Sequence, residues 1–318
     1  MSSPEQTYAA AGVSLATADA IVDRLRSAVA STATPGVVGA FGAFAGLFAI
    51  DNHRLLAAST DSVGSKLVLG RRGDRLHWCG EDLAAHCIND VLTTGAEPLF
   101  FLDYVAANSI DIEQVAALIE GAADVCRAAG CAILGGETAE LPGIYREDEI
   151  DFCGTAVGVV DRDRVVDGSR IEAGDVVVGF PSAGIHANGF SLVRRIVGDE
   201  PFDADLLLPP TRLYLDAVRA LRARADVRGL AHVTGGGIAG NLARVLPAGV
   251  GAVVDPACWE RPQVFGWLAA NGVAEEELRS VFNIGIGYCA VIPAADVADG
   301  DLVIGRVAAG LEGVEWAT

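Results

Sequence analysis

The segment TDSVGSKLVLG, residues Thr60–Gly70, begins at the last residue of the short apolar stretch 55–60 and introduces an arrangement that recurs along the chain. A short apolar strand ends, and a polar or glycine-rich loop follows it directly. Strands and helices are mixed throughout, which predicts an α+β or α/β fold. Loops at strand ends are also where functional sites collect. The same order returns at three later loops: GGETAELPG (residues 135–143), SAGIHANG (residues 182–189) and HVTGGG (residues 232–237).

A charged segment divides the chain in two. Residues 161–175 contain few large apolar side chains, which is typical of a connection between domains. We therefore predict an N-terminal domain of residues 1–168 and a C-terminal domain of residues 169–318. The chain has 318 residues, which is enough for two domains with sizeable cores.

Composition narrows the class of protein. Asp and Glu total 42 against 23 basic residues, and a net charge of -19 disfavours nucleic acid or an anionic membrane as a partner. The most apolar run, residues 36–50, is too short and too rich in glycine to span a membrane. Seven scattered cysteines without a C-x-x-C pair indicate reduced thiols and a cytoplasmic location.

Lys66 is the only lysine among the 23 basic residues. Leu67 stands where a P-loop needs a hydroxyl residue, so that motif is excluded. The compact ammonium of lysine fits a tight phosphate site that the larger guanidinium would not enter. Chance in an arginine-rich chain explains a single lysine equally well. Asp61, five residues earlier, is a candidate ligand for a divalent metal.

Other loops carry further candidates. Asp90 lies in a helix that is otherwise apolar, where an unpaired carboxylate is costly, so a metal ligand or a local cap is indicated. Glu137 follows Gly135 and Gly136, a pattern that suits either Mg²⁺ and phosphate or an ordinary turn. Thr234–Gly237 precedes a predicted helix, as anion sites do and as common turns also do.

The loop SAGIHANG carries His186 and Asn188 between glycines, ahead of a helix. A lone histidine is more often structural than catalytic, but its place in a glycine loop before a helix makes the two interpretations equally good. Taken together, Asp61, Asp90 and Glu137 predict a metal site, and Lys66 with the glycine loops predicts phosphate binding. This combination is typical of a protein that binds Mg²⁺ and a nucleotide.

The motifs resemble those of the phosphoribosylformylglycinamidine cyclo-ligase family, also called the aminoimidazole ribonucleotide (AIR) synthase family. The resemblance runs from about residue 8 to about residue 293. It rests on TDSVGSK, HCINDVLTTGAEPLFFLDY, GGETAELPG, SAGIHANGFSLVR, HVTGGG and FNIGIG, which occur in the order and spacing of that family.

This resemblance implies a fold and a reaction. The fold would be α+β, with an N-terminal ferredoxin-like α/β domain that pairs across a homodimer and an α/β C-terminal domain. The reaction would be the ATP-dependent cyclisation of formylglycinamidine ribonucleotide to 5-aminoimidazole ribonucleotide, with release of ADP and phosphate, in purine biosynthesis. ATP and Mg²⁺ would be the cofactors, with K⁺ as an additional candidate.

The resemblance also implies roles for individual residues. Catalysis would involve His186, Asn188 and Lys66. Asp61, Asp90 and Glu137 would hold the metal. The nucleotide would be bound by Gly39, Gly42, Gly46, Asp61, Ser65, Lys66, Asp90, Gly135, Gly136, Glu137, Thr234, Gly235 and Gly236.

Three departures from the family pattern keep different functions open. Ala43, Ala45 and Ser62 stand where glycine is expected. They are compatible with a paralogous amide-activating enzyme that acts on another substrate. The chain could also be a small-molecule kinase of the same superfamily, such as thiamine-monophosphate kinase, or a non-catalytic ATP-binding homologue.

Overall fold

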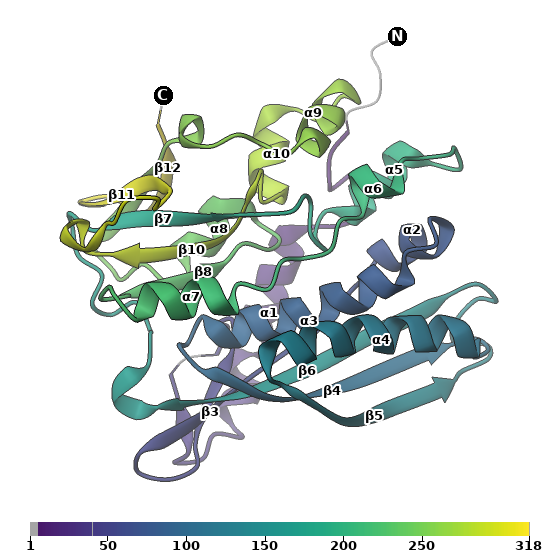
Figure 1. Cartoon of the computed structure of the whole chain (residues 1–318), viewed down its shortest axis with the longest axis horizontal. Helices are drawn as coiled ribbons and strands as arrows, with labels where there is room; N and C mark the ends of the chain where they lie inside the picture. Colours follow the sequence, from purple (N-terminus) through teal and green to yellow (C-terminus); the bar gives the residue numbers. More distant parts are fainter. Residues whose placement is uncertain (1–5, 40, 318) are drawn as a thin grey trace.

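The computed structural model describes residues 6–39 and 41–317. These residues form two six-stranded sheets, one in each half of the chain, together with helices, so the predicted α+β class is confirmed (Figure 1). Helix α3 (Leu76–Leu92) lies between the two sheets. It contacts strands β3 and β6 of the first sheet on one side, and helix α7 and strand β8 of the second half on the other.

The first sheet has the order β1-β2-β3-β6-β4-β5. Its neighbouring strands are antiparallel except β4 and β5, which are parallel. Its strands are β1 (Val37–Val38), β2 (Gly46–Ala49), β3 (Arg54–Ser62), β4 (Glu97–Ala107), β5 (Ala132–Glu140) and β6 (Ile150–Asp161). The helices of this half, besides α3, are α1 (Leu15–Ala30), α2 (Lys66–Arg72) and α4 (Ile112–Ala129).

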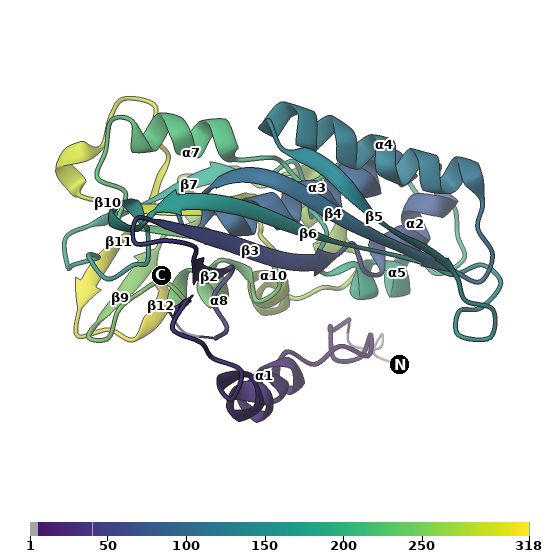
Figure 2. The ribbon, with the colours of Figure 1, turned by 90° about the horizontal axis from the view of Figure 1, so that it is seen from below.

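Helices α3 and α4 cover one face of this sheet, and the opposite face turns outward (Figure 2). Along each strand, residues alternate between the two faces. Five large apolar side chains are exposed on strands of this sheet: Val37, Phe48, Leu99, Leu102 and Leu134. The outward face is called the open face below.

Helices α3 and α4 touch backbone to backbone at two glycines. A Cβ added to Gly80 would lie 2.0 Å from Leu118 O, and one added to Gly121 would lie 1.9 Å from His77 O. Neither position can hold a larger residue unless the helices move apart.

Replacing Gly80 or Gly121 with Ala is therefore expected to lower the free energy of unfolding by about 1–3 kcal/mol, as overpacking does. Urea denaturation measures the change. Gly266→Ala is the matched control, because Gly266 lies in helix α9 and an added Cβ there meets nothing within 4 Å. That variant should gain about 0.5–1 kcal/mol. Equal stabilities for all three variants would contradict the close packing.

The second sheet has the order β12-β9-β11-β7-β10-β8. Its strands are β7 (Val176–Pro181), β8 (Gly229–His232), β9 (Val250–Val254), β10 (Ile286–Ile292), β11 (Val303–Ala309) and β12 (Gly313–Trp316). The helices of this half are α5 (Phe190–Val197), α6 (Ala204–Leu207), α7 (Leu215–Arg222), α8 (Gly237–Ala243), α9 (Gln263–Ala270) and α10 (Glu275–Val281). Short 3-10 turns are η1 (Arg162–Arg164), η2 (Pro256–Cys258) and η3 (Ala294–Asp296).

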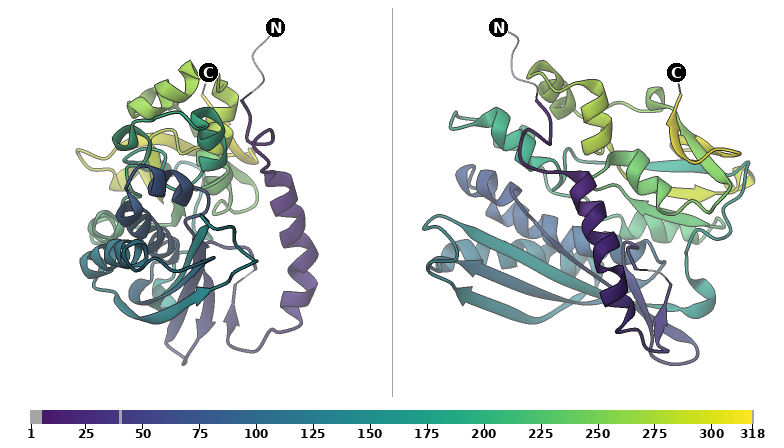
Figure 3. Two further views of the ribbon diagram at one scale, coloured as in Figure 1. Left: turned by 90° about the vertical axis from the view of Figure 1, so that its right-hand side faces the viewer. Right: turned by 180° about the vertical axis from the view of Figure 1, so that it is seen from behind.

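Helix α1 stands beside both halves of the molecule (Figure 3). Ser14 caps it by accepting a hydrogen bond from the backbone N–H of Thr17, as its sequence predicts. Ile21 and Leu25 of this helix are exposed. Within the described ranges, no helix combines the length and apolar character that a membrane crossing requires.

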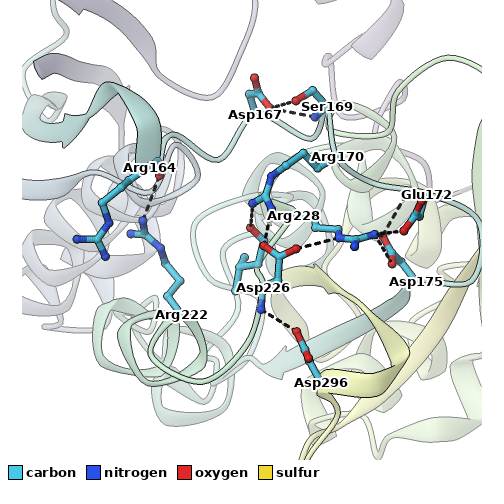
Figure 4. A network of polar contacts seen from close by, with 11 residues as sticks. Arg164, Asp167, Ser169, Arg170, Glu172, Asp175, Arg222, Asp226, Arg228 and Asp296 are labelled. Carbon is cyan, nitrogen blue, oxygen red and sulfur yellow. Dashed lines mark hydrogen bonds and ion pairs between the residues drawn. The ribbon is translucent and has the colours of Figure 1, made fainter. Parts of the chain in front are cut away.

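The segment between the two sheets is held by ion pairs to the second half (Figure 4). Arg228 binds Glu172 and Asp175, and Arg170 binds Asp226. The first sheet ends at Asp161 and the second begins at Val176, so the boundary predicted between residues 168 and 169 falls in this segment.

Two segments differ from the sequence prediction. GGETAE is not a loop but part of strand β5, where Gly136 pairs with Asp103 of β4. A Cβ at Gly136 would lie 2.2 Å from Asp103 O, so this glycine permits a close approach of two strands. Gly46, which the resemblance assigns to nucleotide binding together with Gly39 and Gly42, lies not in a loop but at the start of strand β2, where it pairs with Ala58.

Candidate active site

Two carboxylates predicted as metal ligands lie near one another where α3 packs on β3. Asp61 stands near the end of β3, and its Oδ2 is 3.7 Å from Nδ1 of His86 on α3. Asp90, one helical turn beyond His86, accepts a hydrogen bond from Ser59 Oγ at 3.0 Å. Ser59 and Asp61 are two residues apart on a strand, so they face the same helix. The Asp61 side chain is 36% exposed, so its carboxylate is accessible to a ligand.

A second histidine joins Asp90 from the other half of the chain. His232, at the end of β8, lies with Nδ1 2.8 Å from Asp90 Oδ1. Burial lowers the pKa of His232 to about 3, so its ring is neutral and donates Nδ1–H to the carboxylate. Burial also raises the pKa of Asp90 to about 6. The rings of His86 and His232 meet edge to face, with centroids 4.7 Å apart.

The glycine loops of the second half reach the same place. Asn188 Nδ2 is 3.3 Å from Nε2 of His86. A Cβ on Gly235 would lie 3.5 Å from Asn188 Oδ1, so the loops SAGIHANG and HVTGGG are in contact. The site therefore combines residues of β3, α3 and two loops of the second half. We call Asp61, His86, Asp90, Asn188 and His232 the polar cluster.

A cleft of about 1140 Å³ lies beside the TGGG loop and is lined by residues of α1, α8 and α10, with Gly42, Gly235 and Gly236 among them. Arg244, also in its lining, donates from Nη2 to Gly42 O at 3.0 Å. The Arg244 guanidinium lies 3.7 Å from the ring centroid of Phe44. Arg244, in the second half, thus holds residues 41–46 of the first half, which are called the glycine-rich segment below.

Lys66 has a different place from the one predicted. It is the first residue of α2, and its side chain is fully buried. Its ammonium lies 2.6 Å from Asp82 Oδ2 and donates to the carbonyl oxygens of His186 at 2.9 Å and Pro209 at 3.2 Å. No N–H group remains accessible to a ligand, so this geometry does not support the predicted contact with phosphate. Instead, Lys66 joins α3 to two loops of the second half.

Glu137 does not join Asp61 and Asp90. The strand pairings align Glu137 with Tyr104, Cys153 and Ser62 across the sheet, so Glu137 and Ser62 lie on the same face. Asp61 is the residue before Ser62 on β3. Neighbouring residues of a strand point to opposite faces, so Glu137 lies on the open face. Three strand spacings, about 14 Å, also separate it from the end of β3. The three predicted metal ligands therefore do not meet within one chain, and Gly135 and Gly136 lie away from the cluster with Glu137.

His186 is fully buried and packs near Tyr214, with ring centroids 6.2 Å apart. Burial holds its pKa well below the usual range. Its φ of 67° is rare for a residue with a side chain and marks a constrained loop. Among the described residues, its ring nitrogens have no hydrogen-bond partner, and its backbone carbonyl is the group that Lys66 binds.

The remaining predicted residues lie around these features. Ser65 Oγ is 3.2 Å from Ser191 Oγ, which links α2 to α5. Thr234 Oγ1 donates to Asn241 Oδ1 at 3.2 Å and orders the TGGG turn. Gly39 has a φ of 82° and open space around its Cα.

Sequence reasoning overlooked His86, His232, Asp82 and Arg244. One signal was present for the helix residues: Asp82, His86 and Asp90 are spaced at i, i+4 and i+8, so they form one polar stripe along α3. The partners of the other two residues come from distant segments, and no local pattern marks them.

Comparison with known proteins assigns the family. Residues 42–160 match the family model for the AIR synthase related protein, N-terminal domain, and residues 172–310 match that for its C-terminal domain. The chain is 47% identical over 307 residues to a phosphoribosylformylglycinamidine cyclo-ligase of Thermosynechococcus vestitus, covering 92% of this chain and 90% of the relative. It is 45% identical over 309 residues to the enzyme of that name from Anaeromyxobacter sp., with the same two shares.

A solved structure described as AaThiL complexed with AMPPCP and TMP has the same fold, with a TM-score of 0.67 and 17% identity, covering 93% of this chain and 92% of that one. Both domain models match in order, and the two relatives match nearly end to end. The chain therefore belongs to the phosphoribosylformylglycinamidine cyclo-ligase, or AIR synthase, family, as the resemblance of its motifs predicted.

Proposed function

We propose that this protein catalyses the ATP-dependent cyclisation of formylglycinamidine ribonucleotide to 5-aminoimidazole ribonucleotide, with release of ADP and phosphate. The observation that carries the proposal is the near end-to-end similarity to enzymes named for this reaction. The polar cluster supports it, because it brings carboxylates and histidines of both halves together beside glycine loops. The proposal includes a cytoplasmic location and a role in purine biosynthesis.

The reaction needs activation because an amide oxygen is a poor leaving group. Transfer of the γ-phosphoryl group of ATP to the formyl oxygen converts that oxygen into part of a phosphate. The amidine nitrogen of the same molecule then attacks the formyl carbon, and inorganic phosphate leaves. The attack is intramolecular, so proximity lowers its barrier. The protein supplies positioning and electrostatic stabilisation for the transferred group.

The residues present suit Mg²⁺ at Asp61. Its exposed carboxylate is the kind of ligand that Mg²⁺ takes together with water and phosphate oxygens. Asp90 already binds Ser59 and His232, so it would hold the residues around Asp61 in position. When bound, Mg²⁺ supplies charge neutralisation at the phosphoryl oxygens. Asn188 would orient the substrate, and the buried His86, whose pKa burial lowers, would hold Asn188 in position through the 3.3 Å contact of its Nε2 with Asn188 Nδ2. The proposal also includes a requirement of the reaction for K⁺.

The assay that tests this function contains purified protein, formylglycinamidine ribonucleotide, ATP and Mg²⁺. Aminoimidazole ribonucleotide is followed by diazo coupling and ADP in parallel. Equal amounts of both products are expected, and omission of Mg²⁺ should stop both. A parallel reaction with thiamine monophosphate tests whether the protein is instead a kinase. Thiamine diphosphate formation without any cyclised product would overturn the proposal.

The contact between Arg244 and the glycine-rich segment gives a prediction. In Arg244→Lys, the stacking on Phe44 and the bond to Gly42 O are lost while the charge is kept. We expect KM for ATP to rise about tenfold, with a smaller fall in kcat, because a desolvated cation–π contact contributes roughly 1–2 kcal/mol. Arg306→Lys is the control, since Arg306 is exposed on β11. An unchanged KM for ATP would show that the glycine-rich segment does not contribute to nucleotide binding.

We further infer a homodimer that forms through the open face. The exposed side chains of Phe48, Leu102 and Leu134 support it, because an uncovered apolar sheet face favours association. Leu102→Glu is expected to give monomers at concentrations where the wild type is dimeric. Sedimentation velocity measures this, with Val297→Glu, an exposed apolar position of the second half, as the control. A dimer that survives Leu102→Glu unchanged would place the interface elsewhere.

A further inference from the structure

A cluster of three potential metal ligands lies on the surface of α3 and α4, apart from the polar cluster. Nε2 of His77 is 3.1 Å from Asp124 Oδ2 and 3.4 Å from Glu81 Oε1. The three ligand atoms lie within 4.8 Å of one another. His77 and Glu81 are four residues apart on α3, and Asp124 comes from α4. We propose that His77, Glu81 and Asp124 bind a divalent transition metal of the Zn²⁺ class.

The two distances from His77 fit a tetrahedral ion, and the oxygens of Glu81 and Asp124 lie within 4.8 Å of each other. With bonds of 2.0–2.2 Å to nitrogen and oxygen, two ligands of Zn²⁺ stand roughly 3.3–3.5 Å apart. One imidazole and two carboxylates leave the fourth position for water. An imidazole ligand suits Zn²⁺ and disfavours Mg²⁺ or Ca²⁺, which take oxygen ligands. The His77 side chain is 39% exposed, so an ion can reach it from solvent.

The surroundings hold the ligands in place. Gly80 and Gly121 bring the two helices into backbone contact, and His77, Glu81 and Asp124 lie within one turn of those glycines. Arg127 binds Oδ1 of Asp124 at 2.6 Å, which leaves Oδ2 directed at His77. An ion here would clamp α4 to α3, the helix that carries Asp82, His86 and Asp90.

The test counts bound Zn²⁺ in the full-length protein. Metal-free protein is titrated with Zn²⁺ in competition with a chromophoric chelator, and excess Mg²⁺ is present to occupy the site at Asp61. The wild type is compared with His77→Ala, Asp124→Asn and the control His53→Ala, which removes another exposed histidine. The melting temperature is measured with and without Zn²⁺. Glu81→Gln replaces any variant that fails to fold without metal.

The wild type and His53→Ala are expected to bind one Zn²⁺ more than the two cluster variants, and only they should melt higher when Zn²⁺ is added. Equal Zn²⁺ counts in all four proteins would overturn the proposal, and the cluster would then be a hydrogen-bonded surface group. Because binding and melting are measured rather than turnover, failure here is distinct from failure of the proposed reaction.

Discussion

Replacing Asp82 with Ala is expected to lower the free energy of unfolding by about 3–5 kcal/mol, because it leaves the ammonium of Lys66 buried without its counter-ion. Both side chains are fully buried, and they lie 2.6 Å apart. Asp82 Oδ1 also accepts hydrogen bonds from the backbone N–H and the hydroxyl of Thr211, at 2.8 and 2.7 Å. Urea denaturation measures the loss.

The control for this change is an exposed pair. Glu149 binds Arg146 at the surface, where removal of one partner costs little. Glu149→Ala should therefore change stability by less than about 0.5 kcal/mol. The double variant Lys66→Met with Asp82→Leu should recover part of the loss, since no charge is left buried. If Asp82→Ala were as stable as Glu149→Ala, Lys66 would not depend on this pair.

The same geometry explains the single lysine. Lys66 has Phe190 beside it, with Nζ 5.2 Å from the ring centroid, and carbonyl oxygens of two loops around it. A guanidinium is larger and planar, so Lys66→Arg should also destabilise the protein. In this structure the ammonium ties the two halves of the molecule together.

Asp61→Asn is expected to reduce kcat/KM for the cyclisation by about 10²- to 10³-fold, the usual effect of losing one group that stabilises a developing charge. Stability should hardly change, because Asp61 is partly exposed and, among the described residues, its Oδ1 accepts only from the adjacent Ser62 N–H. Steady-state kinetics and melting temperature are measured together.

Asp163→Asn is the control for this prediction, since Asp163 is an exposed carboxylate in the connection between the halves. It should keep full activity. Normal turnover in Asp61→Asn would exclude this carboxylate from the reaction. A loss of activity that follows a fall in melting temperature would make its role structural.

The parts of the fold that depend on local chemistry could be predicted. Asp111 caps α4 through the backbone N–H groups of Glu113 and Gln114, and Gly130 ends it with a φ of 67°. Periodicity and capping residues are local, so sequence alone reveals them. The short strands β2 and β12 could not be predicted, because four residues of strand carry little periodic signal.

The site could be predicted only in part, for a related reason. Asp61, Asp90 and Asn188 stand out as polar residues in apolar or glycine-rich surroundings, and the structure brings all three to the polar cluster. Glu137 does not join them within one chain, and the sequence could not reveal this because strand and turn look alike for GGETAE, whereas the face of Glu137 depends on strand register. The phosphate role predicted for Lys66 is not supported, since its counter-ion, Asp82, lies sixteen residues further along the chain and no local pattern links the two.

The most direct measurement follows the formyl oxygen of the substrate. Formylglycinamidine ribonucleotide carrying ¹⁸O in its formyl group is converted with ATP, and the inorganic phosphate is analysed by mass spectrometry. If the formyl oxygen is phosphorylated before ring closure, each aminoimidazole ribonucleotide formed is accompanied by one phosphate containing ¹⁸O. Ring closure with unlabelled phosphate and ¹⁸O in water would contradict phosphoryl activation, and absence of cyclised product would contradict the proposed function itself.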